Sequence, residues 1–233
     1  MILKDGNKNK DLVKKWNDIS FFRYPVKTKT IKKDDTLTDI IHEYCDDFIQ
    51  DGDIIAIAES VISVTQNRAY KFSEIKYGFF AKLLSGFVTR TPAGIGLGTP
   101  QTMQLAINET GIFRILCAAG IAAITKPFGL KGMFYRIAGE RARGIDGPTE
   151  NTLPPYNKYA SLLPKNPNKV LDDLRHSFSD KKIQFCIVDA NDIGVNLVGK
   201  YNKNFALHMK SMFTDNPLGQ GSESTPFLII REF

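Results

Sequence analysis

Hydrophobic and polar positions follow different repeats along the chain, and each repeat predicts one kind of element. Apolar residues recur at helical spacing over 37–48, which predicts a helix. Apolar runs at 53–58 and 183–188 predict two strands that are buried on both faces. Alternation over 24–31 predicts a half-buried strand, which Pro25 would keep near the edge of its sheet. Strands and helices are therefore expected to mix, as in an α+β protein.

The middle of the chain adds further helices. Thr99-Pro100 predicts a helix start, because Pro is favoured at the first helical position after a capping residue. The charge-free stretch 115–125 is far shorter than the ~20 residues of a membrane-spanning helix, so a buried helix is expected there. A further helix is expected over 167–178. We expect a basic N-terminal segment over residues 1–20 and one domain over 21–233, a length that also allows two intertwined subdomains.

The net charge of +6 is unevenly distributed. Residues 1–33 carry ten Lys or Arg and three Asp, whereas the rest of the chain carries 21 basic and 22 acidic groups. A nucleic-acid interface usually interleaves basic and aromatic residues along one face. We therefore expect a solvated arm and no nucleic-acid partner; nucleic-acid binding through residues 1–33 is the alternative. The start of the chain lacks the apolar core of a secretory signal, which predicts a cytoplasmic protein without a membrane partner.

The cysteines and histidines show no metal-ligand spacing. Cys45, Cys117 and Cys186 lie far apart without a C-x-x-C pair, and we expect small core residues in a reducing compartment. The three histidines fall on separate predicted helices, which favours packing or surface roles over a zinc site.

Carboxylates are the most informative candidate ligands. Asp189 comes where an apolar strand is expected to run out into a loop, with Asn191 and Asp192 close behind. Open sheets bind ligands at the carboxyl ends of their strands, and clustered oxygen ligands suit Mg²⁺ or Mn²⁺. Asp146 occupies a glycine-rich turn, and convergence of Asp146 with Asp189 would favour a bound cation. Taken singly, each aspartate could also be a turn or capping residue.

Two small-residue segments could contact ligands. The loop that contains Gly94, Gly96 and Gly98 precedes a predicted helix and could present backbone N–H groups to a phosphate. It lacks the ending of a P-loop, and a plain tight turn is an equal alternative. The segment 216–226, which includes Gln220, could be a substrate loop or merely a flexible connection.

Several segments, taken in order along the chain, share their pattern with one family. They are 25–28, 51–58, 63–68, Gly144-Ile145-Asp146, Leu162-Leu163-Pro164 and Asp189. Together they resemble the γ-glutamyl ligases that add glutamate to coenzyme F-420. The chain departs from that family at six positions. Ser60 stands in place of a lysine, Gln66 in place of a glutamate and Asn67 in place of a glycine. Pro148 stands in place of a serine, Thr149 in place of an asparagine and Ala190 in place of a threonine.

The resemblance implies a two-part, γ-glutamyl-ligase-like α+β fold with mixed sheets and packed helices, usually as a homodimer. It also implies that GTP or ATP, with Mg²⁺ or Mn²⁺, phosphorylates a substrate carboxylate. The amine of an amino acid such as glutamate would then attack the acyl phosphate. A non-catalytic nucleotide- or metabolite-binding protein on the same fold is the alternative.

Site residues follow from the motifs and the resemblance together, and no catalytic group is assigned. The expected metal ligands are Asp146, Asp189 and Asp192. The expected nucleotide or substrate contacts are Arg68, Gly94, Gly96, Gly98, Arg141 and Gln220.

Overall fold

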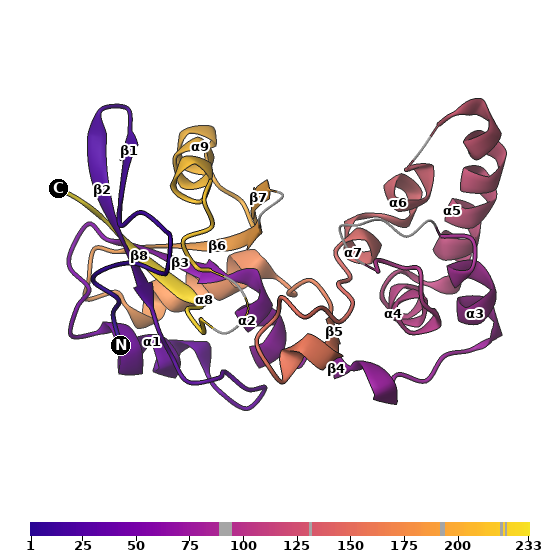
Figure 1. The fold of residues 1–233 in the computed structure, drawn as a ribbon, viewed down its shortest axis with the longest axis horizontal. Helices are drawn as coiled ribbons and strands as arrows, with labels where there is room; N and C mark the ends of the chain where they lie inside the picture. The colour runs from indigo at the N-terminus through magenta and orange to yellow at the C-terminus, as the bar shows by residue number, and fades with distance from the viewer. Residues whose placement is uncertain (89–94, 131, 192–193, 220, 222) are drawn as a thin grey trace. The chain divides into compact units, whose positions relative to one another are not determined.

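The chain forms two compact units, and one is inserted into the sequence of the other. The computed structural model describes residues 1–88, 95–130, 132–191, 194–219, 221 and 223–233. Residues 1–67 and 164–233 form what we call the sheet unit, and residues 68–163 form the helical unit (Figure 1). The expected α+β class with a mixed sheet is confirmed.

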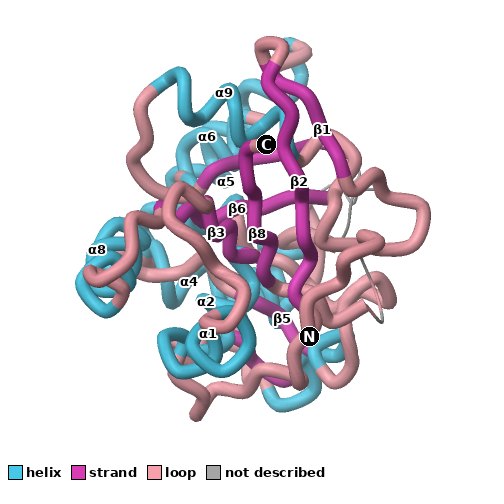
Figure 2. Tube along the Cα trace, turned by 90° about the vertical axis from the view of Figure 1, so that its left-hand side faces the viewer, coloured by secondary structure: helices cyan, strands magenta, loops and turns pink. Residues whose placement is uncertain are grey.

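The sheet unit is built on a six-stranded mixed sheet, and Figure 2 shows most of its strands. In spatial order its strands are β1 (Val13–Trp16), β2 (Ile19–Val26), β8 (Phe227–Glu232), β3 (Ile54–Ala58), β6 (Gln184–Asn191) and β7 (Gly194–Leu197). The strands β3 and β6 run parallel, and the other neighbours run antiparallel. The predicted runs at 53–58 and 183–188 thus form the buried middle of the sheet.

Helices cover both faces of this sheet (Figure 1). The helix α9 (Lys203–Met212) packs Met209 and Met212 against a core that includes Ala56 and Cys186. The opposite side carries α1 (Leu37–Cys45) and α8 (Pro167–Ser177), while α2 (Glu59–Thr65) follows β3 directly. Because side chains alternate along a strand, Ile55 and Ile57 point away from the α9 side, and both are fully buried.

The N-terminal basic segment joins the sheet. The strand β1 pairs with β2 through a register that sets Val13 opposite Phe22. Arg23 is fully buried and donates to both carboxylate oxygens of Asp215, and to the backbone oxygens of Asp11 and Met212. Asn7 is also buried and donates to the Pro217 oxygen and the Thr225 hydroxyl, so the N-terminal segment is part of the fold and not a solvated arm. The strand β2 is second from the edge of the sheet, and β1 pairs only with Ile19–Phe22, so Pro25 lies near the edge as predicted.

The last strand, β8, is anchored by a buried ion pair. Arg231 donates from Nε and Nη2 to the two oxygens of Asp53, at 2.8 and 2.7 Å, and Asp53 is 1% exposed. Gly52 adopts φ +92°, which favours glycine, and its N–H donates to the Lys182 oxygen. Asp51 accepts the Lys182 N–H in return. The Asp-Gly-Asp segment therefore has a structural role at the start of β3.

The helical unit contains short helices that pack against one another and a two-stranded sheet of β4 (Ala69–Lys71) and β5 (Tyr159–Ser161). Its α-helices are α3 (Phe79–Ser85), α4 (Pro100–Thr110), α5 (Ile112–Thr125), α6 (Met133–Ala138) and α7 (Glu140–Arg143). Three 3-10 turns, η1 (Phe72–Glu74), η2 (Lys126–Phe128) and η3 (Tyr156–Lys158), complete it. The core includes Met103, Leu105 and Ala106 of α4. The predicted start of α4 is confirmed, since Thr99 accepts the Thr102 N–H.

The helix α5 differs from its prediction. Only Ile115 and Ala118 are buried, so the expectation of a buried helix was wrong for its outward face. Cys117 lies on that face and is exposed, whereas Cys45 and Cys186 are buried as expected. Within the described ranges, no single helix is long and apolar enough to cross a membrane; α4 and Ile112–Phe128 pass that test only together, bent by 117°.

We expect Asp53→Ala to lower the free energy of unfolding of the sheet unit by about 3 kcal/mol, because it strands a partly buried Arg231. Urea unfolding followed by fluorescence of Trp16, the single tryptophan, measures this loss. The matched control is Asp172→Ala, which breaks an exposed pair with Arg175 and should cost less than about 1 kcal/mol. Equal losses in the two variants would contradict the anchoring role of Asp53.

Candidate functional site

Three backbone segments meet side by side in the helical unit and bring two predicted site residues together. Ser161 of β5 pairs with Ala69 of β4. On its other side, Ser161 forms a bridge with Asp146, whose N–H donates at 3.0 Å and whose oxygen accepts at 2.9 Å. The Leu162 N–H donates to the Arg68 oxygen at 3.0 Å. The strand β5 therefore links Arg68 and Asp146, and Asp146 lies in an extended bridge instead of the expected turn.

The glycines of the Gly144–Gly147 segment allow unusually close packing. A Cβ on Gly144 would lie 2.4–2.6 Å from side-chain atoms of Leu163. A Cβ on Gly147 would lie 3.3 Å from the Ile95 Cβ and would also contact Thr102 near the start of α4. These contacts fix the backbone on both sides of Asp146, whose side chain is exposed. Asp146 is thus held beside the first turn of α4, and we call this arrangement the Asp146 corner.

The described part of the glycine loop is a closed turn. Gly96 has φ +51°, and a Cβ there would lie 2.9 Å from the Tyr135 hydroxyl. The Leu97 N–H donates to that hydroxyl at 3.4 Å, and the Gly98 N–H donates to the Ile95 oxygen at 3.0 Å. These two amides already have partners within the protein. Gly94 lies outside the described residues.

Arg68 is occupied by contacts inside the helical unit. Its Nε donates to the Leu163 oxygen at 2.6 Å, and its Nη2 donates to Glu109 at 2.8 Å. The side chains of Arg68 and Glu109 are 6% and 12% exposed. Arg68 therefore orients Glu109, a residue that the motifs of the sequence did not indicate. Arg141, also predicted, is exposed on α7, which packs against α4.

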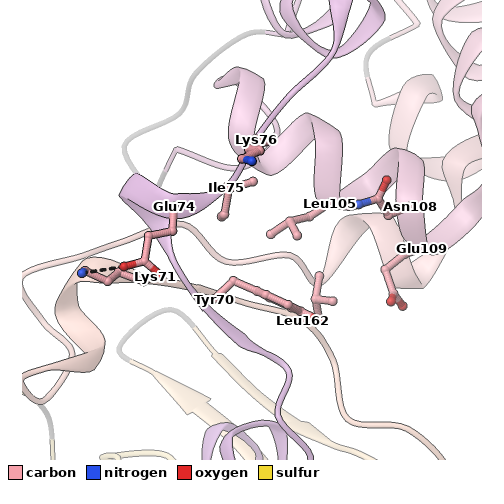
Figure 3. Close-up of a pocket in the computed structure, with 9 residues that line it drawn as sticks. All are labelled: Tyr70, Lys71, Glu74, Ile75, Lys76, Leu105, Asn108, Glu109 and Leu162. Atoms are coloured by element: carbon pink, nitrogen blue, oxygen red, sulfur yellow. Dashed lines mark hydrogen bonds and ion pairs between the residues drawn. The ribbon is translucent and has the colours of Figure 1, made fainter.

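A cavity of about 380 Å³ opens beside this ion pair (Figure 3). It is lined by Tyr70, Lys71, Glu74, Ile75, Lys76, Leu105, Asn108, Glu109 and Leu162. Lys71 and Glu74 form an ion pair at one side, while Asn108 and Glu109 of α4 lie at the other. The pocket carries both charge signs and several apolar side chains. Sequence reasoning missed these residues, although Tyr70 and Lys71 closely follow the motif that ends at Arg68.

Asp189 belongs to the sheet unit and lies within β6. The strand continues to Asn191, so the expectation that Asp189 ends its strand was wrong; pairing with β7 extends the strand. Asp189 is half-buried and stands opposite Asn196 of β7. Burial raises the pKa of Asp189, and a hydrogen bond with the Asn196 side chain only partly offsets that rise. Asp192 and Gln220, two further predicted site residues, lie outside the described residues.

Gln66 stands at the position of the family's glutamate and has a structural contact. Its Nε2 donates to the Lys165 oxygen at 2.9 Å, and its Oε1 accepts the Lys165 N–H at 2.6 Å. An ionised glutamate could not make both contacts, because a carboxylate has no donor. The replacement of glutamate by Gln66 therefore allows both hydrogen bonds to the Lys165 backbone.

The burial of Asp189 is compatible with a bound divalent cation. Among the described residues, no three His, Cys, Asp or Glu side chains gather as a ready metal site. However, Mg²⁺ is often bound by one or two carboxylates together with substrate phosphates and water. Asp189 is a half-buried carboxylate with a raised pKa, and a cation would compensate the cost of its ionisation.

The chain belongs to the F420-0:gamma-glutamyl ligase family, whose model matches residues 25–197. The match extends through both units and includes Asp146 and Asp189, which confirms the resemblance seen in the sequence. No curated protein sequence matches this chain.

We expect Gly144→Ala to destabilise the helical unit by about 1–3 kcal/mol, because the new methyl group overlaps Leu163. Shortening its neighbour in the double variant Gly144→Ala/Leu163→Ala should recover part of that loss, so the two effects should not add. Far-ultraviolet circular dichroism during urea unfolding measures each variant.

Gly120→Ala is the matched control for this cycle. A Cβ at Gly120 meets nothing within 4 Å, and alanine in a helix should stabilise by about 0.5–1 kcal/mol. Strict additivity of the Gly144 and Leu163 variants would show that the close contact does not hold the Asp146 corner.

Proposed function

We propose that this protein is a nucleotide-dependent ligase that forms an amide bond through an acyl-phosphate intermediate. GTP or ATP would phosphorylate a substrate carboxylate, and the amine of an amino acid such as glutamate would displace the phosphate. The family match over residues 25–197 is the observation that carries this proposal. The protein would work in the cytoplasm, where nucleotide and amino acid are abundant, and as a homodimer.

Asp146 and Asp189, with Asp192, would hold the divalent cation. The ion would offset the negative charge that the phosphates carry during phosphoryl transfer. Arg141, exposed on α7 beside α4, would add positive charge for a phosphate oxygen. The amides of Leu97 and Gly98 already donate within the protein, so this part of the loop would shape the start of α4 more than it would bind phosphate.

The pocket beside Glu109 would bind the amino acid. A zwitterion needs a cation for its carboxylate and an anion for its ammonium group, and the pocket offers Lys76 and Glu109. Arg68 holds the carboxylate of Glu109 in place, so Glu109 would orient the ammonium group. The strand β5 lies between Asp146 and β4, so the corner and the pocket residue Tyr70 are about two strand spacings apart, roughly 10 Å.

We propose an acceptor other than coenzyme F-420 itself. Pro148 and Thr149 replace the family's serine and asparagine directly after the Asp146 corner. A folate-like or peptide-like carboxylate would need the same activation and a different pocket. A second candidate function is a nucleotide- or metabolite-binding protein without turnover, which the amide contact of Gln66 at the glutamate position favours.

We expect phosphate release from GTP or ATP to require Mg²⁺ or Mn²⁺, a carboxylate acceptor and an amino acid. Asp146→Asn should lower this release about 100-fold, because it neutralises a cation ligand. Mass spectrometry of the purified protein with pooled amino acids and a metabolite extract gives the readout. A product heavier by one amino-acid residue identifies the acceptor.

Asp172→Asn, an exposed change on α8, is the control and should leave the release rate unchanged. Tight nucleotide binding without phosphate release across the whole screen would instead support the non-catalytic binder. Efficient glutamylation of coenzyme F-420 alone would contradict the proposed acceptor class.

Asp189→Asn should stabilise the protein at neutral pH when nucleotide and metal are absent. The folded state raises the pKa of Asp189, so it binds the proton more tightly than the unfolded state does. The wild type is therefore favoured below the ordinary value of 3.8 and loses that advantage as the pH rises through the raised value. The gain in melting temperature should be largest at neutral pH and shrink toward pH 3.8.

With magnesium nucleotide present, the wild type should become more stable than Asp189→Asn. The wild type should gain stability from it by mass action, whereas Asp189→Asn should gain little. Thermal unfolding with and without magnesium nucleotide measures both effects. A variant that melts lower than the wild type without ligand, or gains as much with it, would exclude Asp189 as a cation ligand.

A further inference from the structure

The outward face of α5 is apolar along its whole length. Six residues recur at three- and four-residue spacing and therefore lie on one face of the helix: Phe113, Leu116, Cys117, Gly120, Ile121 and Ile124. All six are exposed, with Phe113 at 81% and Ile124 at 68%. The opposite face supplies Ile115 and Ala118 to the core. A helix that is apolar on all sides is normally buried, so this face indicates a partner.

The apolar surface continues beyond the helix. Phe128, in η2, is 79% exposed, and Leu130 is exposed two residues later. We call the six residues of α5 together with Phe128 and Leu130 the α5 face. Large exposed apolar patches are uncommon on free proteins and mark sites of interaction.

The charge around this face has one sign. Residues 110–139 contain Arg114, Lys126, Lys131 and Arg136 but no Asp or Glu. Of these, Arg114, Lys126 and Arg136 are exposed, and Lys126 begins η2 directly after α5. The α5 face therefore combines aromatic and aliphatic side chains with basic groups at its margins.

This combination favours an anionic lipid surface over a second copy of the chain. A second copy would bring the same uncompensated positive charge to the interface, whereas anionic headgroups bring the opposite charge. The 14 residues of α5 span about 21 Å, too short to cross the ~30 Å hydrocarbon core of a bilayer. A helix of this length can lie in the interface with its apolar face inserted roughly 5–10 Å.

We infer that the α5 face docks the protein onto membranes that carry anionic lipid. Phe113, Ile124 and Phe128 enter the boundary between headgroups and acyl chains, while Lys126 and Arg136 remain at the headgroups. The contact is peripheral, unlike a membrane span, and it does not depend on the proposed ligase reaction.

Cys117 provides a built-in reporter for this contact. It is the exposed cysteine of the α5 face, whereas Cys45 and Cys186 are buried and burial raises the pKa of both thiols. A polarity-sensitive fluorophore on Cys117 should shift to the blue with vesicles of phosphatidylcholine that contain about 30 mol% phosphatidylserine. Vesicles of phosphatidylcholine alone should give a much smaller shift, and added salt should reduce the binding.

Three variants test the roles of apolar and basic groups by vesicle co-sedimentation. Ile124→Glu/Phe128→Glu should lower binding to anionic vesicles at least about tenfold, since it places charge within the inserted face. Lys126→Glu keeps the apolar face and should lower binding about tenfold through charge alone. Leu207→Glu, at a residue of α9 that is 51% exposed, is the matched control and should bind like the wild type.

The reactivity of Cys117 distinguishes a lipid surface from a second copy of the chain as the partner of the α5 face. In the free protein the thiol should react rapidly with a water-soluble thiol reagent at every protein concentration. Slow reaction that accelerates on dilution, together with a dimer that Ile124→Glu/Phe128→Glu dissociates, would assign the face to a second copy. Rapid reaction without vesicle binding, or binding that the three variants leave unchanged, would also overturn the inference.

Discussion

A bidentate ion pair between Asp53 and Arg231 holds the last strand of the chain in the middle of the sheet. The strand β8 pairs with β2 on one side and β3 on the other, so it joins the N-terminal hairpin to the β3–β6 pair. Without β8, the hairpin β1–β2 would have no neighbour in the sheet. The parallel strands that carry Asp189 and lead into α2 therefore depend on a contact between residues 178 positions apart.

Close packing of glycine has a similar organising effect in the helical unit. Gly144 contacts Leu163, and Gly147 contacts Ile95, so the short segment between them has little freedom to move. The resulting corner fixes the backbone of Asp146 by two hydrogen bonds to Ser161. Leu162 follows β5 directly; its N–H donates to the Arg68 oxygen, and its side chain lines the pocket. A glycine-isoleucine-aspartate motif thus acts through packing as well as through its carboxylate.

The helical unit also carries several of the surface features described above. It contains the Asp146 corner, the mixed-charge pocket and the α5 face, while the sheet unit supplies Asp189. Residues 68–163 hold twelve Lys or Arg and five Asp or Glu, a net charge of +7, although the whole chain has only +6. The positive balance near the N-terminus is offset within the sheet unit, where Asp215 pairs with Arg23 and Lys14. The positive charge that remains uncompensated therefore belongs to the inserted unit.

The sequence by itself determined the elements whose periodicity is local, together with the family. Buried runs gave β3 and β6, the Thr99-Pro100 pair gave the start of α4, and the ordered motifs gave the γ-glutamyl ligase resemblance. Tertiary structure decided features that depend on distant partners. Pairing of Val13–Trp16 added one further strand outside β2, and pairing with β7 extended β6 past Asp189. Glu109 became a site residue only because Arg68, 41 positions away, folds against it. The uncovered side of α5 has the same origin, since hydropathy records how apolar a helix is but not which face its neighbours cover.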